Sequence, residues 1–310
     1  MTEKKTNSKI FSNMIFVTFA ALLCCALWGS ATPFIKIGSA LMIPPKHVPS
    51  TMLFAGVRFT FAGILTIIIY SIARRKFLYP KRENIGKVAL IGSVQTVIQY
   101  IFFYIGLAYT SGVKGTIISG SNAFFTILIS CLVFGQEKLT LRKVIACLIG
   151  FSGIILVNLN GLKLEMNLLG DCYVLFSAIA YAFSSSLMKI FSKYEDPVVI
   201  SGYQFVMGGI FMIIIGLVFG GTITISSLRA VGVMTYLALL SAVAYSLWGI
   251  LLKHNPVSKV SIFSFMIPVM GVILSELMLT ESSNVSPLNL IFTIILVSGG
   301  IILLNYKKQN

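Results

Sequence analysis

The sequence predicts an all-α polytopic membrane protein whose ten transmembrane helices form two inverted five-helix repeats. Three observations support this fold class: the composition, the number and length of the apolar runs, and the distribution of Lys and Arg between them. Of the 310 residues, 57% are hydrophobic and 11% are charged, whereas roughly 25% of an average soluble domain is charged. A soluble fold of this size needs more polar surface to cover its core. The composition therefore excludes a soluble enzyme, a disordered chain and a peripheral protein with one anchor.

The apolar runs have the length of membrane-spanning helices, which need about 20 mostly apolar residues. The connections between them are short, so no separate soluble domain is expected. The first run is too long for a signal peptide and lacks a small-residue cleavage site, which favours a retained helix. The ten runs cover residues 14–36, 50–73, 86–109, 112–134, 141–159, 168–191, 198–219, 229–251, 257–279 and 287–305.

Proline and glycine mark several of the predicted helix ends. Pro44-Pro45 follows the first run, Gly220-Gly221 follows the seventh, and Asn255-Pro256 separates the eighth from the ninth. Ser286-Pro287 opens the tenth run as an N-cap with proline at the first helical position. These signals agree with the boundaries that hydrophobicity predicts.

The basic residues lie in short tracts between the apolar runs, so membrane topology explains the net charge of +15 better than nucleic-acid binding does. Cytoplasmic loops carry an excess of Lys and Arg. With the amino terminus inside, eighteen basic residues fall on the internal side. The five on the external side are Lys36, Lys46, Lys114, Lys163 and Arg229. We therefore expect a multi-pass protein of the cell membrane, with both termini cytoplasmic and no nucleic-acid partner.

Two halves of the chain share an order of motifs. The fifth run ends in Gly-Ile-Ile-Leu-Val-Asn at 153–158, and the tenth ends in Gly-Ile-Ile-Leu-Leu-Asn at 300–305. Five helices are an odd number, so the second half must enter the membrane from the opposite side, as in the inverted repeats of secondary transporters. This predicts a cytoplasmic tail at 1–13, a first repeat at 14–160, a second repeat at 161–306 and a second cytoplasmic tail at 307–310.

These features resemble the ten-helix EamA branch of the drug/metabolite transporter superfamily, over about residues 15–305. The likeness is carried by the stretch 26–36, by Arg58-Phe59 with Ala62, by Gly135-Gln-Glu-Lys-Leu139, by Ile267-Pro268 through Gly271, and by the acidic helix end at Glu281. The resemblance implies a transporter of metabolites. Amino acids and related compounds are the leading substrates, and export is the favoured direction.

Candidate pathway residues are the polar and aromatic side chains inside the spans, because such groups are costly in lipid and should face a cavity or a partner helix. Two stretches at i, i+4 spacing place such groups on one helix face. They are Trp28, Thr32 and Lys36 in the first run, and Tyr181, Ser185 and Lys189 in the sixth. We predict that the aromatic and hydroxyl groups line a central cavity with a lysine at each mouth. The alternative is that the lysines snorkel to the interface and that the aromatic rings belong to the interfacial belt.

The third and eighth runs add a second set. Gln95 and Gln99 lie one turn apart beside Tyr100, and Tyr245 and Trp248 lie in the eighth run, with Tyr245 aligned to Tyr100 between the halves. The glutamines either offer hydrogen bonds to a polar substrate or bond between helices to hold the bundle together, for about 1 kcal/mol.

The fourth and ninth runs carry Asn122 and Ser264 near mid-span, followed in the ninth by Pro268. A proline interrupts the hydrogen-bond ladder of a helix. The carbonyl that it frees could bind substrate or permit bending, and the alternative is a static kink without a ligand.

Arg58 lies about eight residues inside the second run, in the predicted outer half of the bilayer. A buried arginine requires an acidic partner or carbonyl oxygens. Glu276 in the ninth run and Asp171 at the outer end of the sixth are the two candidates, and outward snorkelling of Arg58 is the alternative. The same acids leave coupling to protons or sodium open.

The sequence therefore predicts a secondary transporter that binds a small polar metabolite between its halves and works by alternating access. A passive channel is the first alternative and a membrane-embedded enzyme the second. An enzyme would need clustered catalytic groups, but the two histidines, His47 and His254, each stand alone. No catalytic residue, cofactor or metal site is expected. The partners are the substrate and the lipid bilayer, and the oligomeric state is left open.

Overall fold

All regular structure in the described residues is helical. The computed structural model describes residues 9–110, 112–159, 167–278 and 286–306. Its helices are α2 (Met14–Met42), α3 (Val48–Ala73), η1 (Arg82–Asn84), α4 (Ile85–Ile91), η2 (Gly92–Ile98), α5 (Gln99–Tyr109), α6 (Gly112–Gly120), α7 (Asn122–Leu132), α8 (Leu141–Val157), α9 (Leu168–Phe191), α10 (Pro197–Val218), α11 (Leu228–His254), α12 (Val257–Ser261), η4 (Ile262–Phe265), α13 (Met266–Met278) and α14 (Pro287–Asn305).

The predicted class, an all-α polytopic membrane protein, is confirmed. Within the described ranges, nine helical segments are long and apolar enough to cross a membrane. The remaining predicted span, at 141–159, corresponds to α8, a helix of 17 residues. Its crossing, and with it the count of ten, stays a prediction.

The first helix is longer than predicted. It continues to Met42 instead of ending at residue 36, and Pro33 lies inside it without breaking it, as neighbouring helices in membrane proteins allow. The apolar stretch that follows Lys36 extends the helix up to the Pro44-Pro45 signal. Lys36, assigned from the sequence to an external loop, therefore lies within α2.

Three of the predicted spans are irregular in their interiors. The third contains the π-helical segment η2, a form found often at functional sites. The fourth is interrupted at Ser121, between α6 and α7. The ninth begins with α12 and passes through the 3₁₀ turn η4 before α13. Asn122 and Ser264 thus lie at interruptions in the two corresponding helices of the halves.

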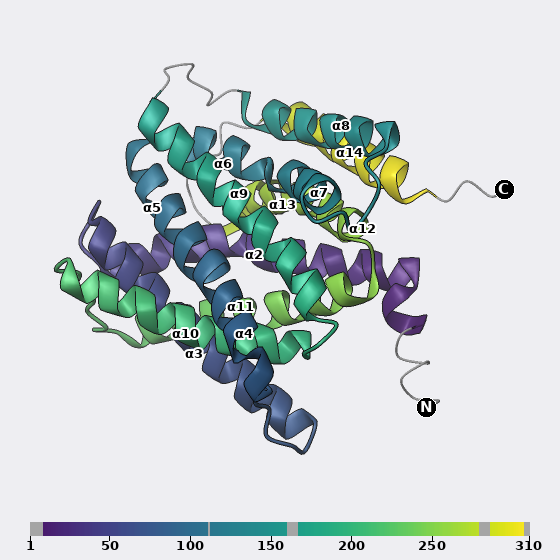
Figure 1. Ribbon diagram of the computed structural model, residues 1–310. Helices are drawn as coiled ribbons and strands as arrows, with labels where there is room; N and C mark the ends of the chain where they lie inside the picture. The colour runs from purple at the N-terminus through teal and green to yellow at the C-terminus, as the bar shows by residue number, and fades with distance from the viewer. Residues whose placement is uncertain (1–8, 111, 160–166, 279–285, 307–310) are drawn as a thin grey trace.

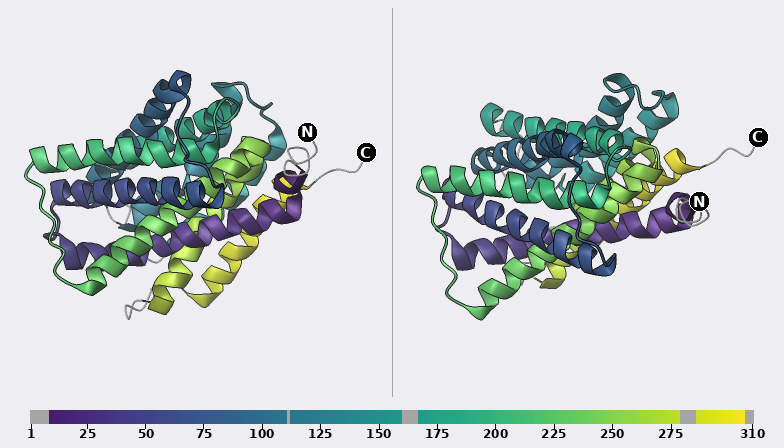
Figure 2. Two further views of the ribbon diagram at one scale, coloured as in Figure 1. Left: turned by 90° about the horizontal axis from the view of Figure 1, so that it is seen from below. Right: turned by 60° about the horizontal axis from the view of Figure 1, so that its bottom comes forward.

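Several helix contacts recur between corresponding helices of the two predicted repeats. The most extensive contacts join α3 to α10 and α8 to α14, and Figure 1 shows α8 and α14 together along one edge, away from α3 and α10. The contact of α5 with α9 has its counterpart in α11 with α2, and that of α7 with α9 in α13 with α2. The start of α2 and the end of α14 lie on the same side of the bundle in Figures 1 and 2.

Glycines bring α3 and α10 into backbone contact. A Cβ added at Gly63 would lie 2.5 Å from the carbonyl oxygen of Gly202, and one added at Gly209 would lie 2.6 Å from the backbone nitrogen of Thr60. Both separations are too short for any side chain. Close helix approach through small residues is a main source of packing energy in membranes, so this contact fixes the position of α3 and of Arg58 on it.

We therefore expect Gly63→Ala to lower the free energy of unfolding by about 1–3 kcal/mol, because the added methyl group overpacks the contact between α3 and α10. Thermal unfolding in detergent measures this. Gly232→Ala in α11 is the matched control, since a Cβ there meets nothing within 4 Å. Equal stability of the two variants would contradict the assigned contact.

Candidate functional site

A cavity of about 460 Å³ lies between the two halves. Its walls come from α2, α3, α5, α6, α7, α9, α11, η4 and α13. The structure brings most of the predicted pathway residues together here. They are Trp28, Thr32, Lys36, Arg58, Gln99, Tyr100, Asn122, Tyr181, Tyr245, Ser264 and Pro268.

Four predicted residues with described side chains do not line this cavity. Gln95 is buried in η2, and Ser185 is buried one turn beyond Tyr181 in α9. Trp248 lies beneath Trp28, with ring centroids 5.1 Å apart. Lys189 donates from Nζ to the carbonyl oxygens of Lys253 at 3.1 Å and Asn255 at 2.8 Å, so it binds the carboxyl end of α11 rather than a cavity mouth or the lipid interface. The side chain of Glu276 lies outside those that the structure describes.

Aromatic rings form one wall and the floor of the cavity. Trp28 meets Tyr245 edge to face, with centroids 5.1 Å apart, and Tyr100 packs on Phe59 at 4.5 Å. The hydroxyl groups of Tyr100 and Tyr245 are 2.8 Å apart and share a hydrogen bond. These two tyrosines, 145 residues apart, are the pair that the sequence aligns between the two predicted repeats, and they meet through their hydroxyl groups.

Several residues that line the cavity have a buried polar atom without a hydrogen-bond partner among the described residues. These atoms are Trp28 Nε1, Arg58 Nε and Nη1, Gln99 Oε1 and Asn122 Oδ1. Leaving a buried donor or acceptor unpaired costs about 1–3 kcal/mol. Both donors and acceptors occur among the residues around the cavity, which suits the cavity to a small polar molecule.

The cavity extends to exposed residues of α2. Its α2 residues run from Trp28 toward the carboxyl end of that helix, and Thr32 and Lys36 are exposed. On the amino-terminal side of Trp28, Cys24 and Cys25 of α2 belong to a buried apolar cluster with residues of α11, α12 and η4. The open side is the one predicted to be external, and the packed side is that of the start of α2.

Polar contacts between the halves seal the packed side. Glu137, after α7, accepts hydrogen bonds from the backbone nitrogen of Ser258 at 2.9 Å and from the Ser258 hydroxyl, and it pairs with Lys143 at 2.7 Å. Gln136 donates to the carbonyl oxygen of Ser186 at 2.9 Å. Burial alone would raise the pKa of Glu137, but these hydrogen bonds and the Lys143 charge outweigh it, so the pKa lies below its usual value.

A second part of this seal joins the loops before α4 and α10. Buried Asn84 donates to Glu195 at 3.1 Å, and Arg74 pairs with Asp196, the N-cap of α10. Sequence reasoning missed these contacts because it treated loop charges only as topology signals. Asp196 directly before Pro197 was a usable signal for the start of a helix, since Asp is a preferred N-cap residue.

Arg58 neither pairs with Asp171 nor snorkels to the outer interface, so these two predicted alternatives are wrong. Asp171 is engaged by Lys114 at 2.5 Å and by Thr110 at 2.5 Å, so it does not pair with Arg58. The Arg58 side chain is not extended to an outer interface either, since the residue is only 3% exposed and its guanidinium lies 4.3 Å from the centre of the Phe59 ring. Pairing with Glu276 falls on a side chain outside the described set.

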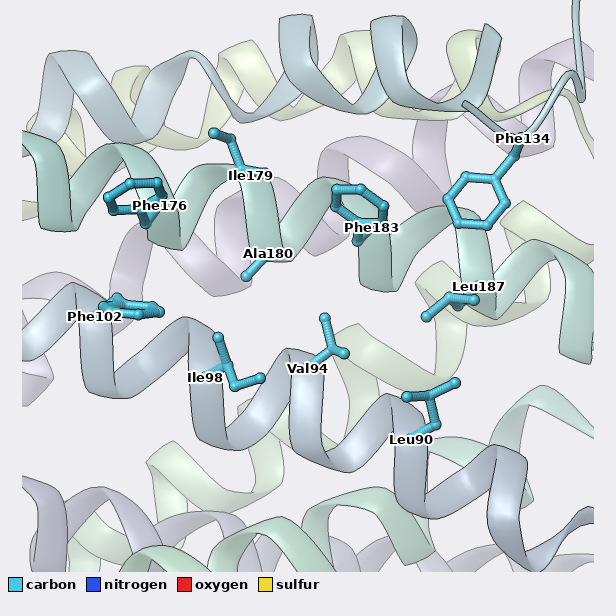
Figure 3. Close-up of a pocket in the computed structure, with 10 residues that line it drawn as sticks. All are labelled: Leu90, Val94, Ile98, Phe102, Phe134, Phe176, Ile179, Ala180, Phe183 and Leu187. Carbon is cyan, nitrogen blue, oxygen red and sulfur yellow. The ribbon is translucent and has the colours of Figure 1, made fainter. Parts of the chain in front are cut away.

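A second hollow, of about 430 Å³, lies between α9 and the continuous helix α4–η2–α5. Figure 3 shows Leu90, Val94 and Ile98 facing Ala180 and Phe183 across it, with no polar side chain among the labelled residues. Such a groove offers no hydrogen bond to a polar molecule, and its exposed rim, which includes Phe176, suits lipid chains. In the described ranges no group of three or more His, Cys, Asp or Glu residues could hold a metal ion.

Comparison with known proteins gives one consistent result. The model of the EamA-like transporter family matches residues 15–159 and 168–306. The chain is 26% identical to an uncharacterized transporter of Archaeoglobus fulgidus, over 84% of this chain and 88% of that protein. It is 27% identical to a probable amino-acid metabolite efflux pump of Escherichia coli, over 84% and 86%. A crystal structure with 17% sequence identity superposes with a TM-score of 0.78, covering 93% of this chain and 96% of that one, which shows a shared fold.

The lowered pKa of Glu137 predicts how stability depends on pH. The stabilisation is present above the ordinary pKa of 4.5 and is lost as the pH falls through the lower folded-state pKa. At pH 7, Glu137→Gln should therefore lower the midpoint of thermal unfolding by several degrees, and the difference from wild type should shrink in acid. Glu83→Gln, at an exposed carboxylate, is the control. A pH-independent difference would show that the Glu137 charge is not responsible.

Proposed function

Because this chain belongs to the EamA-like transporter family, we propose that it is a secondary transporter that moves a small polar metabolite by alternating access. Its membership makes it a membrane transporter and not an enzyme. The substrate, the direction and the mechanism are our proposal. The observation that carries it is the central cavity, which is lined by polar residues from both predicted repeats and reaches exposed residues at Thr32 and Lys36.

The dimensions and lining of the cavity support a metabolite of amino-acid size. Its volume of about 460 Å³ lies in the usual range of small-molecule sites, about 300–1,000 Å³. Aromatic faces can contact the apolar part of such a molecule, while Gln99 and Asn122 offer acceptors to its polar part. The name of the E. coli relative, a probable amino-acid metabolite efflux pump, supports amino acids or related compounds and favours export.

The helix contacts support the proposed division into two inverted repeats. A two-fold axis in the membrane plane would exchange the contact of α5 with α9 for that of α11 with α2. It would pass between Tyr100 and Tyr245, whose hydroxyls meet. In an inverted repeat, exchanging the conformations of the halves produces a state open to the opposite side.

The same relation accounts for the predicted residues that lie outside the present cavity. Thr32 and Lys36 line the open side, whereas their repeat mates Ser185 and Lys189 lie on the sealed side. In the opposite state, Ser185 and Lys189 would line the mouth. The contacts of Glu137 with Ser258 and of Asn84 with Glu195 would then be broken.

A passive channel is the weaker alternative, because a channel needs a continuous path. Here the path ends at Trp28 and Trp248, and the residues beyond them are packed. Saturable counterflow in proteoliposomes would distinguish a carrier from a channel, which would give flux that does not saturate.

We expect Trp28→Ala, Gln99→Ala and Tyr245→Ala each to lower counterflow of amino acids by about tenfold or more, since each loses at least one contact worth about 1.4 kcal/mol. Phe176→Ala, on the lipid-facing groove, is the matched control and should behave as wild type. Binding is checked separately by the rise in unfolding temperature that a bound ligand causes by mass action. Normal transport by all three cavity variants would rule out this cavity as the binding site.

A further inference from the structure

We propose that Arg58 is the carboxylate-binding group of the cavity, so that the transported molecule must carry a free carboxylate. This inference rests on the proposed transport function and names the substrate class for it. Arg58 is 3% exposed, lines the cavity, and has Nε and Nη1 without an acceptor among the described residues. A guanidinium is a permanent cation with N–H donors in a planar arrangement, and carboxylates are among the groups that it binds most strongly.

The protein holds this cation in place without neutralising it. The guanidinium lies 4.3 Å from the centre of the Phe59 ring, which favours a cation without supplying a negative charge. The backbone at this position is fixed by the close approach of α3 and α10, since Gly56 and Gly63 flank Arg58 and both contact α10. The Arg58 side chain therefore starts from a fixed point on α3.

The charges around the cavity leave the counter-anion to the ligand. No described lining residue is Asp or Glu. The acid predicted from the sequence, Asp171, is already engaged by Lys114 and Thr110. A buried cation without an anion is costly in a membrane, so a bound carboxylate gains more here than it would in water.

The other unpaired atoms around the cavity indicate what else the ligand carries besides its carboxylate. Gln99 Oε1 and Asn122 Oδ1 accept hydrogen bonds, and the faces of Trp28 and Tyr100 can hold a cation. These groups suit the ammonium of an amino acid. They are not needed for the carboxylate, so a hydroxy acid with the same side chain should still bind at Arg58, whereas the matching amide and amine should not.

The test compares four analogues of one side chain: the amino acid, the hydroxy acid, the amide and the decarboxylated amine. Each is used to compete in counterflow by wild-type proteoliposomes and to raise the unfolding temperature of the purified protein. We expect both carboxylates to compete and to stabilise, and the amide and amine to be weaker by about 10-fold to 100-fold, the range of a lost charge-assisted hydrogen bond. Equal competition by all four would overturn the subsite while leaving the transport function intact. Failure of every amino acid in a wide panel to give counterflow would instead contradict the proposed function, and the subsite with it.

Variants at Arg58 assign the preference to this residue. Arg58→Gln should remove the advantage of the carboxylates over the amide, and Arg58→Lys should keep part of it because it keeps the charge but not the two-pronged geometry. Arg229→Gln, an exposed cation in the first turn of α11, should keep the wild-type preference. Glu276→Gln tests the alternative that Arg58 pairs with Glu276. If this variant also loses the preference for carboxylates over the amide, Arg58 serves as the partner of Glu276 and the proposal fails. An unchanged preference in Glu276→Gln supports it, and the wild-type comparison remains decisive if an Arg58 variant does not fold.

Discussion

The inability of lipid to satisfy polar groups shapes the whole of this protein. Each helix presents apolar side chains such as Phe176 and Leu90 outward and reserves its polar side chains for other helices, the cavity or the two membrane faces. The hydrophobic effect does not hold helices together within lipid, so close packing must do so. The glycines of α3 and α10 provide such packing. The polar residues inside the spans are consequently few, and several of those without a partner among the described residues, such as Gln99 and Asn122, belong to the lining of the cavity.

This organisation gives the two sides of the cavity different chemistry. The open side exposes Thr32 and Lys36, whereas the other is closed first by the aromatic layer of Trp28 and Trp248 and then by hydrogen bonds from Glu137 and Asn84. Family membership identifies a transporter, and this asymmetry fits a carrier captured in one of two states. The tyrosine pair at the centre would change least between them, because Tyr100 and Tyr245 occupy equivalent places in the two halves.

Hydrophobicity predicted the fold class because lipid imposes one pattern on every span. The boundaries of the spans followed equally well where proline or glycine marked them, as at Ser286-Pro287. α2 continues past its predicted end because a single lysine does not end a helix and no helix-breaking signal follows Lys36 before Pro44. Most cavity residues could be predicted because a polar group inside a span is costly in lipid and therefore faces a cavity or another helix. The backbone partners of Lys189 could not be predicted, since they depend on which helices pack together. The contacts of Asn84 and Glu195 lay among loop charges that topology already explained.

The composition of the seal has a consequence for the speed of the cycle. Hydrogen bonds such as that of Gln136 to Ser186 can be exchanged one at a time for bonds to water, so the net free energy of opening them is small. An apolar plug of the same area would have to expose its whole surface at once. In the proposed alternating-access cycle, a gate made of individually replaceable bonds would lower the barrier between the two states. Apolar substitutions at these hydrogen-bonding residues should therefore slow turnover even if they raise the stability of the folded protein.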